Sequence, residues 1–175
     1  MSDKELRELF EKRRSIRKYK RPATKEELMR ILELARLAPS AKNMQPWRVV
    51  LVTEEAKRKE IMEKVCRDRS FVAEGSLVMI WTEPEVCYTS WRKKEGDNTH
   101  DVDAAIFATY LMLAATTLGL GTCWIAAFDE EPAFELFPEF KGKYRLSAII
   151  VVGEPAEEPP LKGRKSVNEI VVKVI

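Results

Sequence analysis

Apolar and polar positions along the chain repeat with two periods, one typical of helices and one typical of strands. Two S/T-x-x-E spacings, at residues 2–5 and 24–27, match the capping box that begins a helix. These two helices are expected to run to about Arg13 and Ala38. Further helices are predicted over residues 54–65 and 131–137, and strands over 47–53, 76–82, 121–128 and 144–153. Because helices and strands are mixed without strict β-α-β alternation, the pattern favours an α+β domain with a central sheet flanked by helices.

A long uncharged stretch covers residues 104–128, which is 25 consecutive positions and enough to span a bilayer. Acidic residues flank it on both sides without any excess of lysine or arginine, and the sequence TTLGLGT interrupts it near residue 119. A buried helix from about Asp101 to Leu118 therefore explains the stretch better than a membrane span. Such a helix is apolar all round, and a second copy of the chain would cover its remaining face, which favours a homodimer.

Two other segments are predicted to lie at the surface. The stretch Glu83–Asn98 is polar and is expected to be a loop. The end of the chain, EPAEEPPLKGRKSVNEIVVKVI (154–175), is expected to begin as a surface arm and to finish as an apolar strand.

The composition fits one domain over residues 1–175, because 45% of the residues are hydrophobic and 33% are charged. Thirty basic and 28 acidic residues give a formal net charge of +2, which excludes nucleic acid or an acidic membrane as the main expected partner. Three scattered cysteines and the single His100 show no zinc-binding spacing, so no metal site is expected. The cysteine usage and the charged N-terminus, which lacks an apolar signal segment, favour a cytoplasmic location.

Few side chains could perform catalysis directly. The sequence has one histidine and no G-x-S-x-G, P-loop or G-x-G-x-x-G motif. A nucleophilic mechanism that uses His100 stays open as an alternative. A bound cofactor is the better explanation of any enzymatic activity.

Two basic groups and one polar loop could hold such a cofactor. In RRSIRKYKR (13–21), the side chains of Arg13, Ser15 and Arg17 would point the same way in an extended segment and would suit a phosphate. A solvated basic helix end is the alternative, and a nucleic-acid patch is less favoured. The second group is Lys162, Arg164 and Lys165, which could equally be a charged loop tip. The loop APSAKNMQPW (38–47) offers amides and hydroxyls, although ordinary turn chemistry also explains it.

Four segments, in this order, carry a resemblance to a known family. They are RRSIRKY, APSAKNMQPWRVVLVT, DVDAAIFATYLMLAATTLGLGTCWIAAF, and LSAIIVVGEP followed by KGRKSVNEIV. The chain resembles the nitroreductase family of FMN-dependent oxidoreductases over nearly its whole length. The resemblance implies a mostly antiparallel sheet, an interlocked homodimer that exchanges its C-terminal strand, and two FMN sites at the dimer interface.

The resemblance also implies roles for individual residues. Arg13, Arg14 and Ser15 would hold the FMN phosphate and ribityl chain, and Arg17 would lie near the pyrimidine edge of the flavin and tune its chemistry. Arg164 and Lys165 would complete the phosphate site. The loop from the opposite subunit would line the flavin, and the end of the fourth predicted strand would contact its other face. The loop residues are Pro39, Ser40, Ala41, Asn43 and Gln45, and the strand residues are Trp124, Ile125, Ala126 and Ala127.

Alanine stands at three of these positions where relatives often have serine or glycine, namely 41, 126 and 127, so backbone contacts are expected there. The expected activity is hydride transfer from NADH or NADPH to the flavin, followed by reduction of a nitroaromatic, quinone or related small-molecule acceptor by a ping-pong mechanism. Reductive dehalogenation, dehydrogenation of a modified peptide, flavin breakdown and non-catalytic flavin binding are the alternatives that the resemblance permits.

Overall fold

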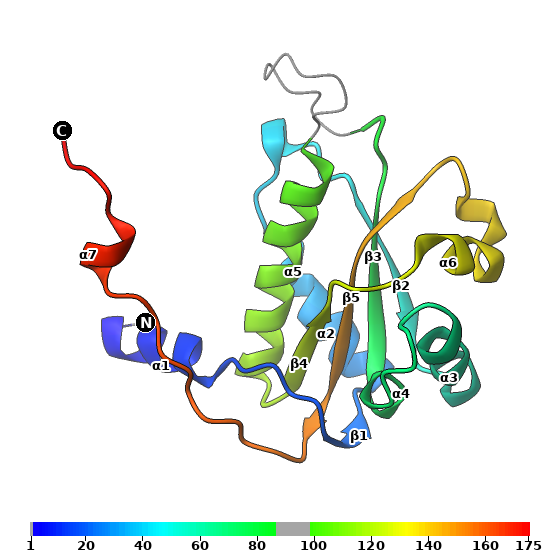
Figure 1. The fold of residues 1–175 in the computed structure, drawn as a ribbon, viewed down its shortest axis with the longest axis horizontal. Helices are drawn as coiled ribbons and strands as arrows, with labels where there is room; N and C mark the ends of the chain where they lie inside the picture. The colour runs from blue at the N-terminus through cyan, green and yellow to red at the C-terminus, as the bar shows by residue number, and fades with distance from the viewer. Residues whose placement is uncertain (1, 87–98) are drawn as a thin grey trace.

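The computed structural model describes residues 2–86 and 99–175. Its centre is an antiparallel sheet that lies between two layers of helices (Figure 1). The strands are β1 (Tyr19–Pro22), β2 (Trp47–Val52), β3 (Ser76–Thr82), β4 (Gly121–Ile125) and β5 (Arg145–Pro155). The sheet order is β1-β5-β3-β2, and β4 pairs with β5. The predicted α+β class with a mostly antiparallel sheet is confirmed.

Each face of the sheet is covered by a different set of helices. One face packs against α2 (Lys25–Ala35) and α5 (His100–Thr117), and the other packs against α3 (Glu55–Lys64), α4 (Phe71–Glu74) and α6 (Glu130–Leu136). Strand β3 is buried along its whole length, with Val78 and Ile80 in one cluster and Met79 and Trp81 in the other. This strand therefore joins two hydrophobic cores, as expected for a continuous apolar run.

Local signals in the sequence predicted several helix ends. Helix α1 (Asp3–Lys12) begins at the Ser2 capping box and α2 begins at the Thr24 capping box, and both predictions are confirmed. Helix α2 ends at Ala35, three residues before the predicted end, and a turn follows. Strand β1 and helix α4 were not predicted from the sequence. Of the predicted loop Glu83–Asn98, residues 87–98 lie outside the described part of the chain.

The central helix α5 is buried along one side within a single chain. Phe107, Ala108 and Leu111 are almost fully buried, whereas Val102 is 59% exposed and Tyr110 is 41% exposed. No described element of the chain covers this second face, so the expected burial of that face against a second copy stays a prediction. None of the helices in the described ranges combines the length and hydropathy that crossing a membrane requires.

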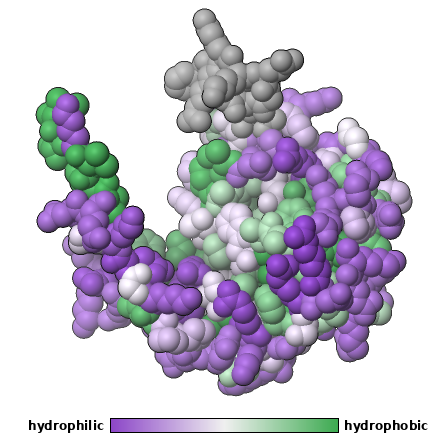
Figure 2. Space-filling view, viewed as in Figure 1, coloured by the Kyte–Doolittle hydropathy of each residue, from purple (hydrophilic) through white to green (hydrophobic). Residues whose placement is uncertain are grey.

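The C-terminal segment leaves the sheet as an arm, residues 156–175. It runs past α1 and away from the body of the molecule (Figure 1), and every residue from 160 onward is exposed. The apolar residues at its end gather in one place (Figure 2). The exposed apolar side chains of this arm tip are Val167, Ile170, Val171, Val172, Val174 and Ile175.

The predicted C-terminal strand is wrong for the single chain. The Ser166 capping box begins a short helix, α7 (Val167–Ile170), and residues 171–175 pair with no strand. An isolated extended segment gains no ladder hydrogen bonds, so this part of the chain has no reason to form a strand alone.

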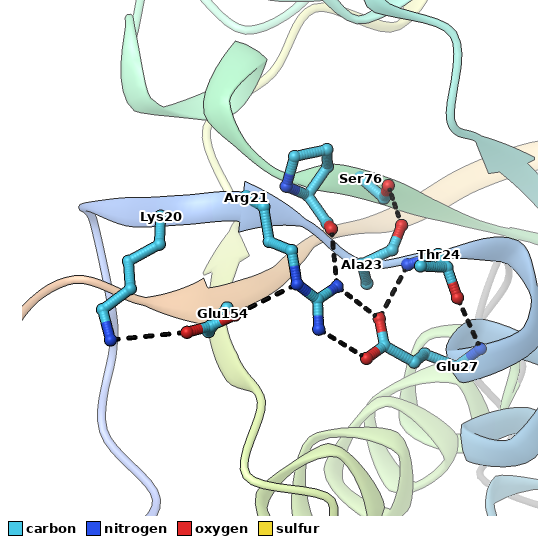
Figure 3. A network of polar contacts seen from close by, with 8 residues as sticks. Lys20, Arg21, Ala23, Thr24, Glu27, Ser76 and Glu154 are labelled. Carbon is cyan, nitrogen blue, oxygen red and sulfur yellow. Dashed lines mark hydrogen bonds and ion pairs between the residues drawn. The ribbon is translucent and has the colours of Figure 1, made fainter.

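A polar network fixes the chain just after the basic segment (Figure 3). The Arg21 guanidinium donates two hydrogen bonds to Glu27, at 2.9 and 2.8 Å, and one to Glu154 at 3.0 Å. The hydrogen bond from Arg21 lowers the pKa of the Glu27 carboxyl to about 2. Ser76 donates to the carbonyl of Ala23 at 2.7 Å. The network ties β1, α2, β3 and β5 together and so fixes where residues 13–18 enter the sheet.

Candidate functional site

The segment between α1 and β1 runs along the outer edge of β4. The amide of Ile16 donates to the carbonyl of Thr122 at 2.9 Å, and Ser15 forms a parallel bridge with the same residue. A side chain at Gly121 would place its Cβ 2.7 Å from Ile16, so glycine permits this close approach. The hydroxyl of Tyr19 donates to the carbonyl of Ile16 at 2.7 Å and fixes the following bend.

Along this extended segment, Arg14 and Ile16 line one cavity and Arg17 lines another. Arg13 and Arg17 both lie close enough to Cys123 to oppose the effect of burial, which raises the pKa of that thiol. Arg14, Ile16 and Thr122 line a cavity of about 550 Å³. Arg14 therefore lines a cavity that Arg13 does not line, and its predicted contact with the FMN phosphate stays a prediction.

The charge of Arg164 acts on Arg13 at one end of the candidate site, although the two residues lie far apart in the sequence. Burial lowers the pKa of the Arg13 guanidinium, and the charges of Arg14 and Arg164 lower it further. Arg164 donates to the carbonyls of Lys162 and Gly163 at 2.9 and 3.1 Å, which bends its side chain back along the arm. Lys165 follows it on the exposed arm. Among the described residues, no carboxylate forms an ion pair with Arg13 or Arg164, so the charges there lack a counter-ion.

A cavity of about 220 Å³ lies at the other end of the segment. Arg17 lines it together with the end of β4, so one chain brings these two predicted regions together. Of the residues predicted to face the flavin from this strand, Ile125 is buried, Trp124 and Ala127 are half-buried and Ala126 is exposed. The lining residues are Arg17, Arg69, Phe71, Cys123, Trp124, Ile125, Ala126 and Ala127.

The loop after α2 has a tightly determined conformation. Lys42, Asn43 and Gln45 have φ angles of 49°, 58° and 48°, in the left-handed region that L-residues rarely adopt. The amide of Gln45 donates to the Ser40 hydroxyl at 2.9 Å, and the amide of Ala41 donates to the Asp103 carboxylate at 3.0 Å. Strain of this kind persists only where neighbours hold the backbone, and it is often found at functional sites.

This loop lies far from the arginines within a single chain. It contacts the first turn of α5, whereas the cavity beside Arg14 includes Thr116 in the last turn of the same helix. An 18-residue helix is about 27 Å long, and Figure 1 shows the two regions at its opposite ends. One chain therefore does not bring Pro39, Ser40, Ala41, Asn43 and Gln45 to the other predicted site residues.

The match to a family model decides the relationship to known proteins. A model described as the nitroreductase family matches residues 10–68 and 64–154. The chain belongs to the nitroreductase family.

Relatives within the nitroreductase family differ in their named activities. A Methanothermobacter thermautotrophicus protein assigned as an NADH dehydrogenase/NAD(P)H nitroreductase is 31% identical over 169 residues, which cover 91% of this chain and 82% of its own. A Thermotoga neapolitana iodotyrosine deiodinase is 29% identical over 186 residues, which cover 97% of each chain. A solved Exiguobacterium sibiricum protein, assigned as a nitroreductase and in complex with FMN, aligns with a TM-score of 0.85 over 99% of this chain and 98% of its own. Its identity is 20%, so this last likeness supports the nitroreductase fold alone.

Two residues of the candidate site were not predicted from the sequence. Arg69 lines the cavity of Arg17, and Asp103 holds the strained loop. Asp103 was read only as an acidic residue before an uncharged stretch. A carboxylate in the first turn of a buried helix was the available signal, because burial of a charge requires specific partners.

Asp103→Ala is expected to lower the free energy of unfolding by about 1–3 kcal/mol, because it leaves the Ala41 amide and the Thr99 hydroxyl without their acceptor. Urea denaturation followed by circular dichroism would measure the change. Asp103→Asn keeps one acceptor oxygen and should lose less. Equal stability of the alanine variant and the parent would mean that this carboxylate does not hold the loop.

Proposed function

We propose that this chain is an FMN-dependent oxidoreductase that takes a hydride from NADH or NADPH and reduces a nitroaromatic, quinone or related small-molecule acceptor. The observation that carries the proposal is that Arg13 and Arg164 act on each other electrostatically, with no ion-pair partner among the described residues, next to the segment that leads to the Arg17 cavity. Membership of the nitroreductase family and the activities named for relatives support the same conclusion.

The residues at the phosphate end fit an anionic group. Two guanidiniums close together repel each other, and the lowered pKa of Arg13 reflects both its burial and these neighbouring charges. A phosphate would remove this repulsion and accept charge-assisted hydrogen bonds from both side chains. Ser15 is half-buried, and alternation along an extended segment would place it on the side of Arg13, where it could donate a further hydrogen bond.

The cavity end fits the aromatic ring of the cofactor. Bound FMN would supply the redox chemistry, accepting a hydride from NAD(P)H and delivering two electrons to the acceptor. Trp124–Ala127 would orient the ring against the end of β4, and Arg17 would place a permanent positive charge beside it. The donor and the acceptor would then use the open side of the cavity in turn, which is the basis of a ping-pong mechanism.

The site is complete only with a second copy of the chain, and we propose that the protein is a homodimer. The loop 39–45 and the arginines lie at opposite ends of α5, so the loop of one copy would line the site of the other. The exposed face of α5 and the apolar arm tip would both be buried in such a dimer. Within the described residues, β2 has β3 as its one neighbouring strand, so its free edge could receive residues 171–175 of the partner.

A flavin titration followed by a turnover assay tests the activity. We expect the purified protein to bind FMN with the shifted absorbance bands of a bound flavin, and then to oxidise NADH or NADPH rapidly when a quinone or nitroaromatic is added. Riboflavin under the same conditions is the control for phosphate recognition. Tight FMN binding without NAD(P)H oxidation by any acceptor would contradict the proposal and favour a flavin-binding protein without turnover.

A further inference from the structure

The turn at residues 65–69 is held against the segment after β4 by three contacts. The amide of Asp129 donates to the carbonyl of Val65 at 2.9 Å. The Arg67 guanidinium donates to both carboxylate oxygens of Asp129, at 3.1 and 2.5 Å. Arg69 then donates to the carbonyl of Ala127 at 2.8 Å. These contacts join segments about 60 residues apart in the sequence, and two of the residues involved, Arg69 and Ala127, line the Arg17 cavity.

The backbone of this turn is unusual in the same way as the loop at 39–45. Arg67 and Asp68 have φ angles of 55° and 54°, although neither residue is a glycine. Two successive left-handed residues reverse the chain between Cys66 and Arg69. The fixed reversal sets the direction in which Arg69 leaves the backbone, and such conformations gather at ligand-binding positions.

The Arg69 guanidinium holds the turn through one of its nitrogens, and its other two nitrogens have no partner among the described residues. Its Nη1 donates to the carbonyls of Cys66 and Ala127, at 3.0 and 2.8 Å. Among the described residues, Nε and Nη2 of Arg69 have no hydrogen-bond or ion-pair partner. The half-buried side chain lines the cavity beside Arg17, and none of the described lining residues is acidic.

The charges of Arg69 and Arg17 both act on the Cys123 thiol. Burial raises the pKa of the Cys123 thiol, and the charges of Arg17, Arg13 and Arg69 act against it while Glu157 adds to it. Cys123 lies at the cavity wall in β4, so it reports the potential where the ring of a ligand would lie. Two guanidiniums therefore make the ring end of the cavity positive, in addition to Arg13 at the phosphate end.

We propose that Arg69 is a second ring-binding arginine, which acts with Arg17 to stabilise the negative charge that the flavin gains on reduction. The inference rests on the proposed function. Hydride transfer from NAD(P)H carries two electrons and one proton, so it leaves NAD(P)⁺ and adds one negative charge to a neutral ring. A guanidinium fixed by Cys66 and Ala127 favours that charged form without having to reorganise.

The test compares Arg69→Gln with the neighbouring Arg67→Gln, each loaded with FMN. Each variant loses one positive charge and one side-chain contact that holds the turn at residues 65–69. Arg67, however, pairs with Asp129, and neither residue lines the cavity. We expect Arg69→Gln to lower the affinity for reduced FMN about tenfold relative to the affinity for oxidised FMN. This change corresponds to a fall of about 30 mV in the two-electron potential of the bound flavin. Arg67→Gln should leave the potential unchanged. Dye-coupled reduction would measure it.

Binding of lumiflavin, which has the ring but neither phosphate nor ribityl chain, is the second readout. Arg69→Gln should lower the affinities for lumiflavin and for FMN by similar factors, whereas loss of a phosphate-binding arginine would lower the affinity for FMN alone. Arg69→Lys keeps the positive charge, so the two-electron potential of its bound FMN should lie close to that of the parent. If Arg69→Gln does not fold, Arg69→His in place of it should show a potential that falls more steeply with pH than that of the parent, as the imidazole loses its charge near pH 6.5.

An Arg69→Gln protein with the potential of the parent and the same loss of stability as Arg67→Gln would overturn the inference, because Arg69 would then hold the turn and nothing more. This outcome is distinct from failure of the proposed function. A parent that binds FMN but does not oxidise NAD(P)H would contradict the proposed activity, while a shifted potential in Arg69→Gln would still support the role of Arg69.

Discussion

Deletion of residues 160–175 is expected to give a folded monomer that does not retain FMN. Every residue of this segment is exposed in the single chain, so its removal leaves both hydrophobic cores intact. The deletion removes the apolar arm tip, which we propose to add to the β2 edge of the partner, and it removes Arg164 from the phosphate end. Light scattering would give the mass, and flavin absorbance after gel filtration would give the occupancy.

Two smaller changes separate these effects. Deletion of residues 171–175 alone keeps Arg164 and should weaken the dimer, whereas Arg164→Ala in the full chain should keep the dimer and weaken FMN binding. A stable monomer of the parent chain that still holds FMN would contradict both the interpretation of the exposed α5 face and the proposed sharing of the site.

Arg13→Ala is expected to raise the dissociation constant for FMN by roughly 10–100-fold, because a charge-assisted hydrogen bond to phosphate contributes about 1.5–3 kcal/mol. Riboflavin lacks the phosphate, so its affinity should barely change. Fluorescence titration with both ligands measures the two constants. Arg164→Ala should behave in the same way, because its charge already acts on Arg13 in the ligand-free chain.

Arg14→Ala is the matched control for this prediction. Arg14 is adjacent in sequence and has the same charge, but its side chain lines the separate cavity of about 550 Å³. Its loss should therefore affect FMN less than the loss of Arg13. Similar losses for FMN and riboflavin in Arg13→Ala would mean that Arg13 does not contact the phosphate.

Elements that depend on local chemistry were predictable from the sequence. The capping boxes at Ser2 and Thr24 gave the helix starts because the side chain and the backbone amides that it caps lie within one turn. Strand β1 was missed because its sequence, YKRP, is basic and short, and it forms only through pairing with β5. The strand expected at the C-terminus failed for the same reason, since a strand needs a neighbour that one chain does not provide.

The candidate site was predictable in part. Alternation in an extended segment predicted Arg13 and Arg17 on one side of the chain, and the charges of both residues act on Cys123. Arg69 and Asp103 were missed because their partners lie 58 and 62 residues away, at Ala127 and Ala41. For Arg69, nothing nearby in the sequence distinguishes it from an ordinary surface charge, whereas Asp103 had one signal, its place in the first turn of a buried helix.

The loop 39–45 lies at one end of α5 and the arginines lie at the other. In the proposed dimer, this arrangement has a genetic consequence. Each site would be a hybrid, so a defect in the loop and a defect in the arginine segment would damage different sites in a mixed dimer. One of its two sites would carry both defects, and the other would be wholly native. Two inactive alleles of this protein could therefore complement each other when expressed together.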